Sequence, residues 1–274
     1  MKRNKNQDSI KSVSRAINVI TAISQNINRV SDIAAEVNLS HSTVHRLLQS
    51  LVESGMVMQD TLHHKYYFGN LIAKLVSDPF TTHQHLIRIS RKRMEYLRSK
   101  TRETVALYIR FGLERIRLEE LMGPQDITYI GRRDVISSIY PGATGKVLLS
   151  QIPQDELQGV LEKLQLVKMT PNTITNKKVL MREVEKARRQ GYATSQGESS
   201  IGVAGISVPI FNYINAVSLS IAGPEERFAP KMMDYLDALK EKANEISLEL
   251  LQSDVRGRSK ATGKDNPTVH KLKT

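Results

Sequence analysis

The apolar pattern of residues 41–55 constrains the N-terminal third of this chain more than any other feature. In HSTVHRLLQSLVESG the aliphatic residues recur at i, i+3, i+4 and i+7, the spacing of a helix with one buried face. These residues are Val44, Leu47, Leu48 and Leu51. Ser40 precedes the pattern as a favourable N-cap, and Gly55 follows it as a favourable helix end. The segment therefore predicts an amphipathic helix that needs packing partners.

Two helices before this segment and a hairpin after it would supply those partners. Residues 13–24 and 31–37 both have helical periodicity. The side chains expected to face inward are Ala16, Ile17, Ile20 and Ile23 in the first helix, and Ile33, Ala34 and Val37 in the second. Two strand-like runs, MVMQD at 56–60 and KYYFG at 65–69, enclose the polar sequence TLHH and predict a β-hairpin.

Three helices followed by a hairpin form a winged helix-turn-helix. We expect this DNA-binding domain at residues 12–74, with the helix-turn-helix at about 31–51, after a flexible N-terminus at 1–11. The polar side of the third helix is predicted to contact DNA through short donors and acceptors and one arginine. These residues are Ser40, His41, Ser42, Thr43, His45, Arg46 and Gln49. The alternative is a three-helix module whose polar face binds another protein.

The distribution of charge supports the DNA-binding interpretation. The net charge is +12, and residues 104–251 carry 18 basic and 18 acidic side chains. The excess positive charge therefore lies outside that block, as expected for a polyanion-binding part joined to a neutral part. A basic linker helix is expected within residues 75–102. Residues 252–274 have few apolar side chains and predict a disordered basic tail.

Residues 103–251 alternate between strand-like and helix-like patterns. Strands are expected at 104–112, 115–123, 126–131, 192–196, 205–211 and 216–223. Helices are expected at 144–150, 154–164 and 176–190, and a closing helix is expected to begin at Pro230. Strands grouped on either side of a block of helices favour an α+β fold with a mainly antiparallel sheet.

Several kinds of chemistry do not fit this sequence. The chain has no cysteine, and residues 104–251 contain no histidine, so a histidine triad or an N/S-ligated zinc site cannot be built there. The sequence GATGKV lacks the first glycine and the Ser/Thr of a P-loop, because Tyr140 and Val147 occupy those positions. We therefore expect no enzyme activity, catalytic residue, metal or cofactor. With neither a signal peptide nor an apolar span, the chain is expected to be cytoplasmic and free of membranes.

The residues quoted so far resemble the IclR-type transcriptional regulators. SVSRAINVITAI, SDIAAEVNLSHSTVHRLLQSLVESGMV and YYFGNLIAKL are similar to the DNA-binding half of that family. PGATGKVLLSQIP and RRQGYATSQGESSIGVAGISVPIFNYINAVSLSIAGP are similar to its effector-binding half. The resemblance implies a GAF-like sensor domain at 103–251 and dimers or tetramers on palindromic double-stranded operators. It also implies repression of a catabolic operon in response to a small organic acid or aromatic compound.

The resemblance further implies an effector pocket formed by Ala143, Thr144, Gly145, Ser195, Gly205, Ser220 and Ala222. The backbone N–H groups of PGATG, at a helix N-terminus, would accept a carboxylate as readily as a phosphate. The alternative is that its glycines only allow a tight turn. Small side chains at Ser195 and Gly205 suggest room for a larger ligand. Activation or dual regulation, a sensor of protein partners, and an enzyme acting on a carboxylic acid stay open as alternatives.

Overall fold

The computed structural model describes residues 5–131 and 135–262, with side chains described at 11–131 and 135–253. The chain divides into two compact units, residues 1–82 and residues 83–274. Each unit has its own buried apolar cluster. Among the described residues, no helix combines the length and apolar character that crossing a bilayer requires.

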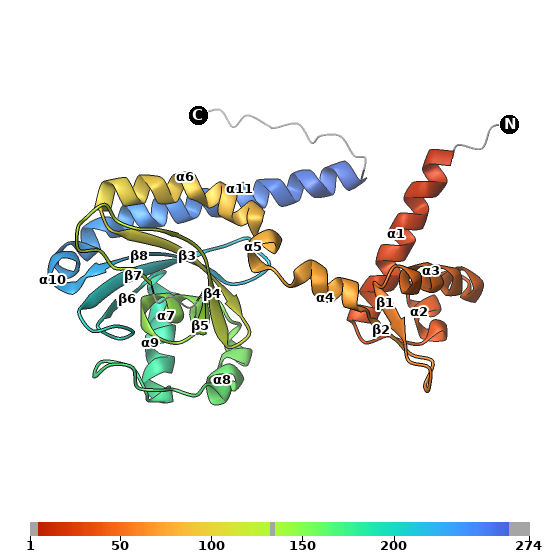
Figure 1. Cartoon of the computed structure of the whole chain (residues 1–274), viewed down its shortest axis with the longest axis horizontal. Helices are drawn as coiled ribbons and strands as arrows, with labels where there is room; N and C mark the ends of the chain where they lie inside the picture. The colour runs from red at the N-terminus through yellow and green to blue at the C-terminus, as the bar shows by residue number, and fades with distance from the viewer. Residues whose placement is uncertain (1–4, 132–134, 263–274) are drawn as a thin grey trace, which may run out of the picture. The chain divides into compact units, whose positions relative to one another are not determined.

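The first unit contains the predicted three helices and hairpin. Its helices are α1 (Lys5–Ser24), α2 (Val30–Glu36) and α3 (His41–Glu53), and its strands are β1 (Val57–Gln59) and β2 (Tyr66–Phe68). The strands pair antiparallel, with Val57 opposite Phe68. Two short helices, α4 (Asn70–Val76) and α5 (Pro79–Thr82), end the unit (Figure 1).

The core of the first unit confirms the apolar pattern of α3 but corrects that of α1. Val44, Leu48 and Leu51 of α3 are buried. Ile17, predicted to face inward, is 56% exposed, whereas Val19 is fully buried. The helix is also longer than expected, because α1 begins at Lys5 within the segment predicted to be flexible. Ile23, predicted to face inward, is buried, and Ile20 packs against the core, whereas Val19 and Ala22 were not selected. Periodicity therefore placed the packed face only approximately.

The second unit is built on a six-stranded antiparallel sheet in the order β5-β4-β3-β8-β7-β6. Its strands are β3 (Thr104–Phe111), β4 (Glu114–Leu121), β5 (Ile136–Ser138), β6 (Ala193–Gln196), β7 (Val203–Ile210) and β8 (Val217–Pro224). Central β3 and β8 connect the two halves of the sheet, with Ala106 opposite Ser220. The α+β arrangement with an antiparallel sheet is as predicted.

The two faces of this sheet differ in chemistry. Side chains alternate between faces along a strand. On β8, Val217, Leu219 and Ile221 belong to the aliphatic core cluster, whereas the intervening Ser218 and Ser220 face the other way. The neighbouring central strands alternate in the same manner, since Leu107 of β3 and Ile206 of β7 join the same cluster. One face is therefore aliphatic and the other carries hydroxyl groups.

Helices cover both faces. The aliphatic face packs against α6 (Gln84–Thr101) and α11 (Leu236–Thr262), which lie side by side (Figure 1). The hydroxyl face is covered by α7 (Gly142–Ser150), which packs against α9 (Lys177–Gln190). α8 (Gln154–Lys163), α10 (Glu225–Phe228) and a 3₁₀ helix, η1 (Ala229–Tyr235), complete the unit.

Three predicted elements differ from the structure. The helix expected to act as a linker, now α6, belongs to the second unit because its buried face joins that unit's core. Residues 126–131 form no strand: the Tyr129 carbonyl accepts a hydrogen bond from the Thr104 hydroxyl, and the Gly131 N–H donates to Glu120. The third strand is instead β5. The closing helix begins as η1 at Ala229 and becomes α11 only at Leu236.

The prediction of a disordered tail at 252–274 is wrong for residues 252–262, because α11 continues through Thr262. Residues 263–274 of that tail, and residues 1–4 of the predicted flexible N-terminus, lie outside the described residues.

Candidate functional site

The N-terminus of α3 is held by a cluster of hydroxyl groups. Ser40 is the N-cap, and its Oγ accepts a hydrogen bond from the Thr43 N–H at 3.3 Å. The same oxygen lies 2.8 Å from the Thr43 hydroxyl and 3.1 Å from the Ser42 hydroxyl. The cap satisfies one of the free N–H groups of the first turn. Ser40 and Thr43 therefore have a structural role whether or not they contact DNA.

The outer side of α3 presents polar side chains to solvent. His41, Ser42, His45, Arg46 and Gln49 are exposed, and Thr43 is half-buried. The apolar side chains between them are turned into the core. The structure thus places the predicted DNA-contacting residues together along one face of a rigid helix, and that face carries an arginine and several hydrogen-bonding groups.

The hairpin adds basic residues that the sequence analysis did not select. His63, His64 and Lys65 lie in the loop between β1 and β2. Asp60 shapes this loop, because it accepts hydrogen bonds from the Leu62 N–H and from the His63 ring. These bonds, that from Leu62 first, hold the pKa of Asp60 below its usual value. The sequence analysis could have selected these residues, because HHK lies within the predicted hairpin.

A small cavity lies between α7 and the hydroxyl face of the sheet. Two cross-strand rows form its floor. Ser195 pairs with Gly205, which pairs with Ala222, which pairs with Thr104. In the next row on this face Ser207 pairs with Ser220, and Ser220 with Ala106. These residues come from β6, β7, β8 and β3, so the cavity draws on segments far apart in the sequence.

Three hydroxyl groups join the floor of this cavity to its roof. Thr144 on α7 lies 2.9 Å from the Ser220 hydroxyl and 3.2 Å from the Ser207 hydroxyl. Ser207 and Ser220 lie 2.5 Å apart. A hydroxyl can both donate and accept, so the network can rearrange its protons around a polar ligand without moving its oxygens.

The glycines of α7 have two different roles. Gly142 has a φ of +76°, and a Cβ there would lie 3.5 Å from the Ser195 hydroxyl and 3.6 Å from that of Ser199. Pro141, the N-cap, supplies no side-chain hydrogen bond to the first turn. A Cβ at Gly145 would instead lie 2.2 Å from the carbonyl oxygen of Ile139. Gly142 therefore opens the helix N-terminus toward the cavity, whereas Gly145 permits close backbone packing.

The wall formed by β3 and β4 brings charge to the cavity. The Arg115 guanidinium lies 5.4 Å from the centre of the Tyr108 ring and donates to the Pro141 carbonyl at 2.7 Å. Burial raises the pKa of Tyr108, so its hydroxyl stays protonated at neutral pH. Arg115 and Tyr108 thus place a cation and a hydrogen-bond donor beside the N-terminus of α7.

Family models match both units of the chain. The model for the IclR helix-turn-helix domain covers residues 12–61, and the model described as bacterial transcriptional regulator IclR, C-terminal, covers residues 79–248. The second match alone spans more than half of the chain. The protein belongs to the IclR family.

Two curated IclR-type relatives are similar over most of their length. The chain is 31% identical to the HTH-type transcriptional regulator KipR of Bacillus subtilis over 81% of this chain and 89% of that protein. It is 30% identical to the HTH-type transcriptional repressor AllR of Klebsiella pneumoniae, over 81% and 82% respectively. These relatives are DNA-binding transcriptional regulators, and so is this IclR-family chain.

Solved structures agree with this assignment. The IclR of Thermotoga maritima is 32% identical and covers 88% of this chain and 99% of its own, with a TM-score of 0.59. An IclR homologue from Microbacterium hydrocarbonoxydans, solved in complex with 4-hydroxybenzoate, is 23% identical over 88% of this chain and 99% of its own, with a TM-score of 0.56. At that identity the second structure supports the fold alone.

The IclR-type fold collects most of the predicted pocket residues in one place. Six of the seven line the cavity, namely Ala143, Thr144, Ser195, Gly205, Ser220 and Ala222. Gly145 is absent from this lining and packs against the backbone of the preceding turn. The cavity volume is about 50 Å³. The expectation of room for a larger ligand is therefore wrong, because the hydroxyl network and Tyr108 close the space that small side chains leave.

Sequence reasoning missed several residues that line the same cavity. They are Thr104, Tyr108, Arg115, Glu120, Tyr129, Ser199 and Ser207. Alternation along GISVPIF offered a signal for Ser207, since it shares a face with Gly205. No local signal marked Arg115 or Tyr129, because the pairing of β3 with β4 and the path of the following loop bring them to the cavity.

Proposed function

We propose that this IclR-family protein is a repressor of a catabolic operon that releases DNA when a small organic acid occupies the cavity beneath α7. The observation that carries the proposal is the exposed polar face of α3, capped at Ser40 and bearing Arg46, in the same chain as a hydroxyl-lined cavity. The curated repressor AllR supports the direction of regulation. The expected operator is a palindromic duplex bound by a dimer or tetramer.

The contact set on α3 divides into two groups. His45, Arg46 and Gln49 have exposed side chains that form no ion pair within the described part of the chain, so they can reach base edges and phosphates. Ser40 and Thr43 share a hydrogen bond in the cap, which leaves them positioned for short contacts to the DNA backbone. Lys65 of the hairpin loop adds a further phosphate contact.

The chemistry of the cavity favours a small polar carboxylate as the effector. The N–H groups at the start of α7 and the Arg115 guanidinium favour an anion. Hydroxyl groups of Thr144, Ser207 and Ser220 suit oxygen atoms elsewhere on the ligand. A volume of about 50 Å³ favours a small acid over an aromatic one.

Binding without turnover is part of the proposal. The cavity has hydroxyl groups, and no histidine or cysteine lines it. Glu120 lines it, but its carboxylate is held by the Arg117 guanidinium and the Gly131 N–H. An ion-paired carboxylate is a weak base for activating a hydroxyl nucleophile. The ligand would therefore act by favouring one of two states of the protein, which requires a difference in its affinity for those states.

Selection of duplexes from a random DNA pool, followed by affinity measurements, tests this function. We expect enrichment of a palindromic sequence whose affinity falls steeply as salt rises, because phosphate contacts release counterions. A panel of small organic acids is then screened by thermal shift, and each hit is titrated against the DNA complex.

Release of DNA by a stabilising acid supports repression, and tighter binding indicates activation instead. Failure to enrich any duplex at low ionic strength would overturn the DNA-binding part of the proposal. Conversion of the acid into a product would overturn binding without turnover.

A further inference from the structure

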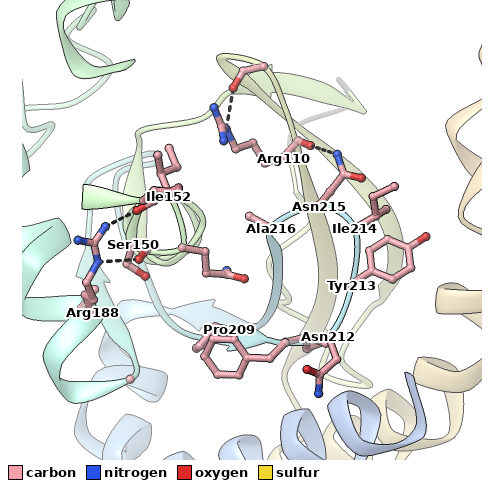
Figure 2. Close-up of a pocket in the computed structure, with 17 residues that line it drawn as sticks. Arg110, Ser150, Ile152, Arg188, Pro209, Asn212, Tyr213, Ile214, Asn215 and Ala216 are labelled. Atoms are coloured by element: carbon pink, nitrogen blue, oxygen red, sulfur yellow. Dashed lines mark hydrogen bonds between the residues drawn. The ribbon is translucent and has the colours of Figure 1, made fainter. Parts of the chain in front are cut away.

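A larger cleft lies at the other end of α7. Its volume is about 700 Å³, and it is lined by the ends of β3, α7 and α9 and by the β7–β8 turn. Figure 2 shows Arg110, Arg188, Tyr213 and Pro209 on different sides of its opening. The cleft shares no lining residue with the cavity beneath the N-terminus of α7, so the two are separate sites.

Arg110 brings an uncompensated positive charge to this cleft. Its Nε donates to the Gly112 carbonyl at 2.9 Å, but its guanidinium makes no ion pair among the described side chains. Burial lowers the pKa of Arg110. The charge of Glu156 acts on this pKa in the opposite direction, but Glu156 lies beyond ion-pair distance. A cation that is partly desolvated without a counter-charge favours the arrival of an anion.

The guanidinium of the second arginine in the cleft, Arg188, already has hydrogen-bond partners in the protein. The Arg188 guanidinium donates to the carbonyl groups of Ser150 and Ile152, at the C-terminal end of α7 (Figure 2). These bonds satisfy carbonyls that a helix end leaves free. Arg188 therefore builds the wall and contributes positive potential, whereas Arg110 retains donors for a ligand.

The rest of the lining mixes polar and apolar side chains, and the apolar ones gather on one turn. Phe211 is 57% exposed and Ile214 is 89% exposed, and both lie on the β7–β8 turn beside Ala216 and Pro209. Exposed apolar side chains around a concave surface are typical of a binding site. An arginine without an ion pair, facing a cleft that also holds exposed apolar side chains, matches a ligand with one anionic end and an apolar body.

We infer that this cleft is a second ligand site, which takes a carboxylate with an apolar body and binds its carboxylate at Arg110. The site is distinct from the effector cavity of the proposed function. Both ends of α7 then meet a ligand, one at Gly142 and one at Ser150. The β7–β8 turn, which lines this site, also carries Tyr213. The Tyr213 hydroxyl lies 2.7 Å from Nδ1 of His83, the residue at which the second unit begins.

Calorimetric titration of the full chain with octanoate tests the inference, with 1-octanol as the uncharged analogue. We expect one octanoate per chain at the cleft and markedly weaker binding of octanol. Arg110→Gln should weaken octanoate binding about tenfold or more, because a charge-assisted hydrogen bond is lost. Arg110→Lys should retain part of the affinity. Arg189→Gln removes an exposed arginine next to Arg188 and serves as the matched control.

Three outcomes would overturn the inference. One is the absence of octanoate binding by the wild-type chain at millimolar concentration. The second is equal octanoate affinity in the wild-type and Arg110→Gln chains, provided that their thermal unfolding curves coincide. The third is loss of octanoate binding in Gly205→Val, which would place the ligand in the cavity beneath α7. A change in sedimentation of Arg110→Gln without octanoate binding would assign the cleft to contacts between chains.

Discussion

The Lys146 ammonium lies 2.6 Å from Oε1 of Glu198, and Lys146 is only 2% exposed. This ion pair joins the middle of α7 to the loop that precedes β7. Thr170 and Thr173 hold the same loop, because their hydroxyl groups donate to the carbonyls of Gly197 and Glu198. Glu198 is followed by Ser199, which lines the cavity, so the ion pair fixes one wall of the site.

Breaking this pair should strongly destabilise the second unit. Lys146→Met is expected to lower the free energy of unfolding by about 2–4 kcal/mol, because it leaves the partly buried Glu198 carboxylate without its main counter-charge. The double variant Lys146→Met/Glu198→Gln should recover at least half of that loss. Urea denaturation measures both. Glu241→Gln, at an exposed ion pair with Lys242, is the control and should change stability by less than about 1 kcal/mol.

Arg46 should contribute directly to operator affinity. Arg46→Ala is expected to weaken binding by about 1–3 kcal/mol if the side chain reads a base. Arg15→Ala, which removes an exposed arginine from α1, is the matched control. Fluorescence anisotropy over a series of salt concentrations measures both affinity and salt slope. Unchanged affinity in Arg46→Ala would remove this residue from the proposed contact set.

Ser40 allows the cap and the DNA contact to be separated. Ser40→Ala should destabilise the first unit by about 1 kcal/mol, because the Thr43 N–H loses its acceptor. Ser40→Asp retains a capping oxygen and should keep the thermal stability of the wild-type chain. It places a negative charge near the phosphates, however, and should weaken operator binding. Equal DNA affinity of Ser40→Asp and the wild-type chain would show that this helix end lies away from DNA.

The glycines of the second unit should respond differently to the same substitution. Gly145→Ala is expected to destabilise the unit by about 1–3 kcal/mol through overpacking, because the new Cβ meets the Ile139 carbonyl at 2.2 Å. Gly205→Ala should be tolerated, since its nearest neighbour would be 3.4 Å away, and should instead reduce the thermal shift produced by the effector. Similar unfolding midpoints for both variants would contradict this assignment of roles.

Acidification should weaken the attachment of the β7–β8 turn to His83. Burial lowers the pKa of His83 below its ordinary value of 6.5, so the unfolded chain binds this proton more readily than the folded one. The stability that neutral His83 contributes is therefore complete above pH 6.5. It is lost as the pH falls toward the lower pKa that His83 has in the folded state. Urea denaturation at pH 7.5 and pH 5.5 should show a larger decrease for the wild-type chain than for His83→Gln.

Local patterns in the sequence were sufficient for the three helices and the hairpin of the first unit, but not for α4 and α5. Helical periodicity, the Ser40 cap and the apolar stripe of α3 depend on interactions within a few residues, and the structure confirms them. The edge of the packed face of α1 was decided by its neighbours, which is why Val19 is buried and Ile17 is exposed, although Ile20 and Ile23 pack as predicted. Periodicity defines an apolar face only when the other side is clearly polar.

Sequence patterns alone predicted a helical first unit, a second unit with an α+β fold and an antiparallel sheet, and no histidine or cysteine in residues 104–251. Which side chains meet at the sites depended on the packing of the folded chain. Strand register aligned Ser195, Gly205, Ala222 and Thr104 across four strands. The packing of α7 placed Gly142 beside the cavity and Gly145 against the preceding backbone. Thr104 and Ala222, for example, are 118 positions apart, and pairing between distant segments leaves no periodic trace in the sequence.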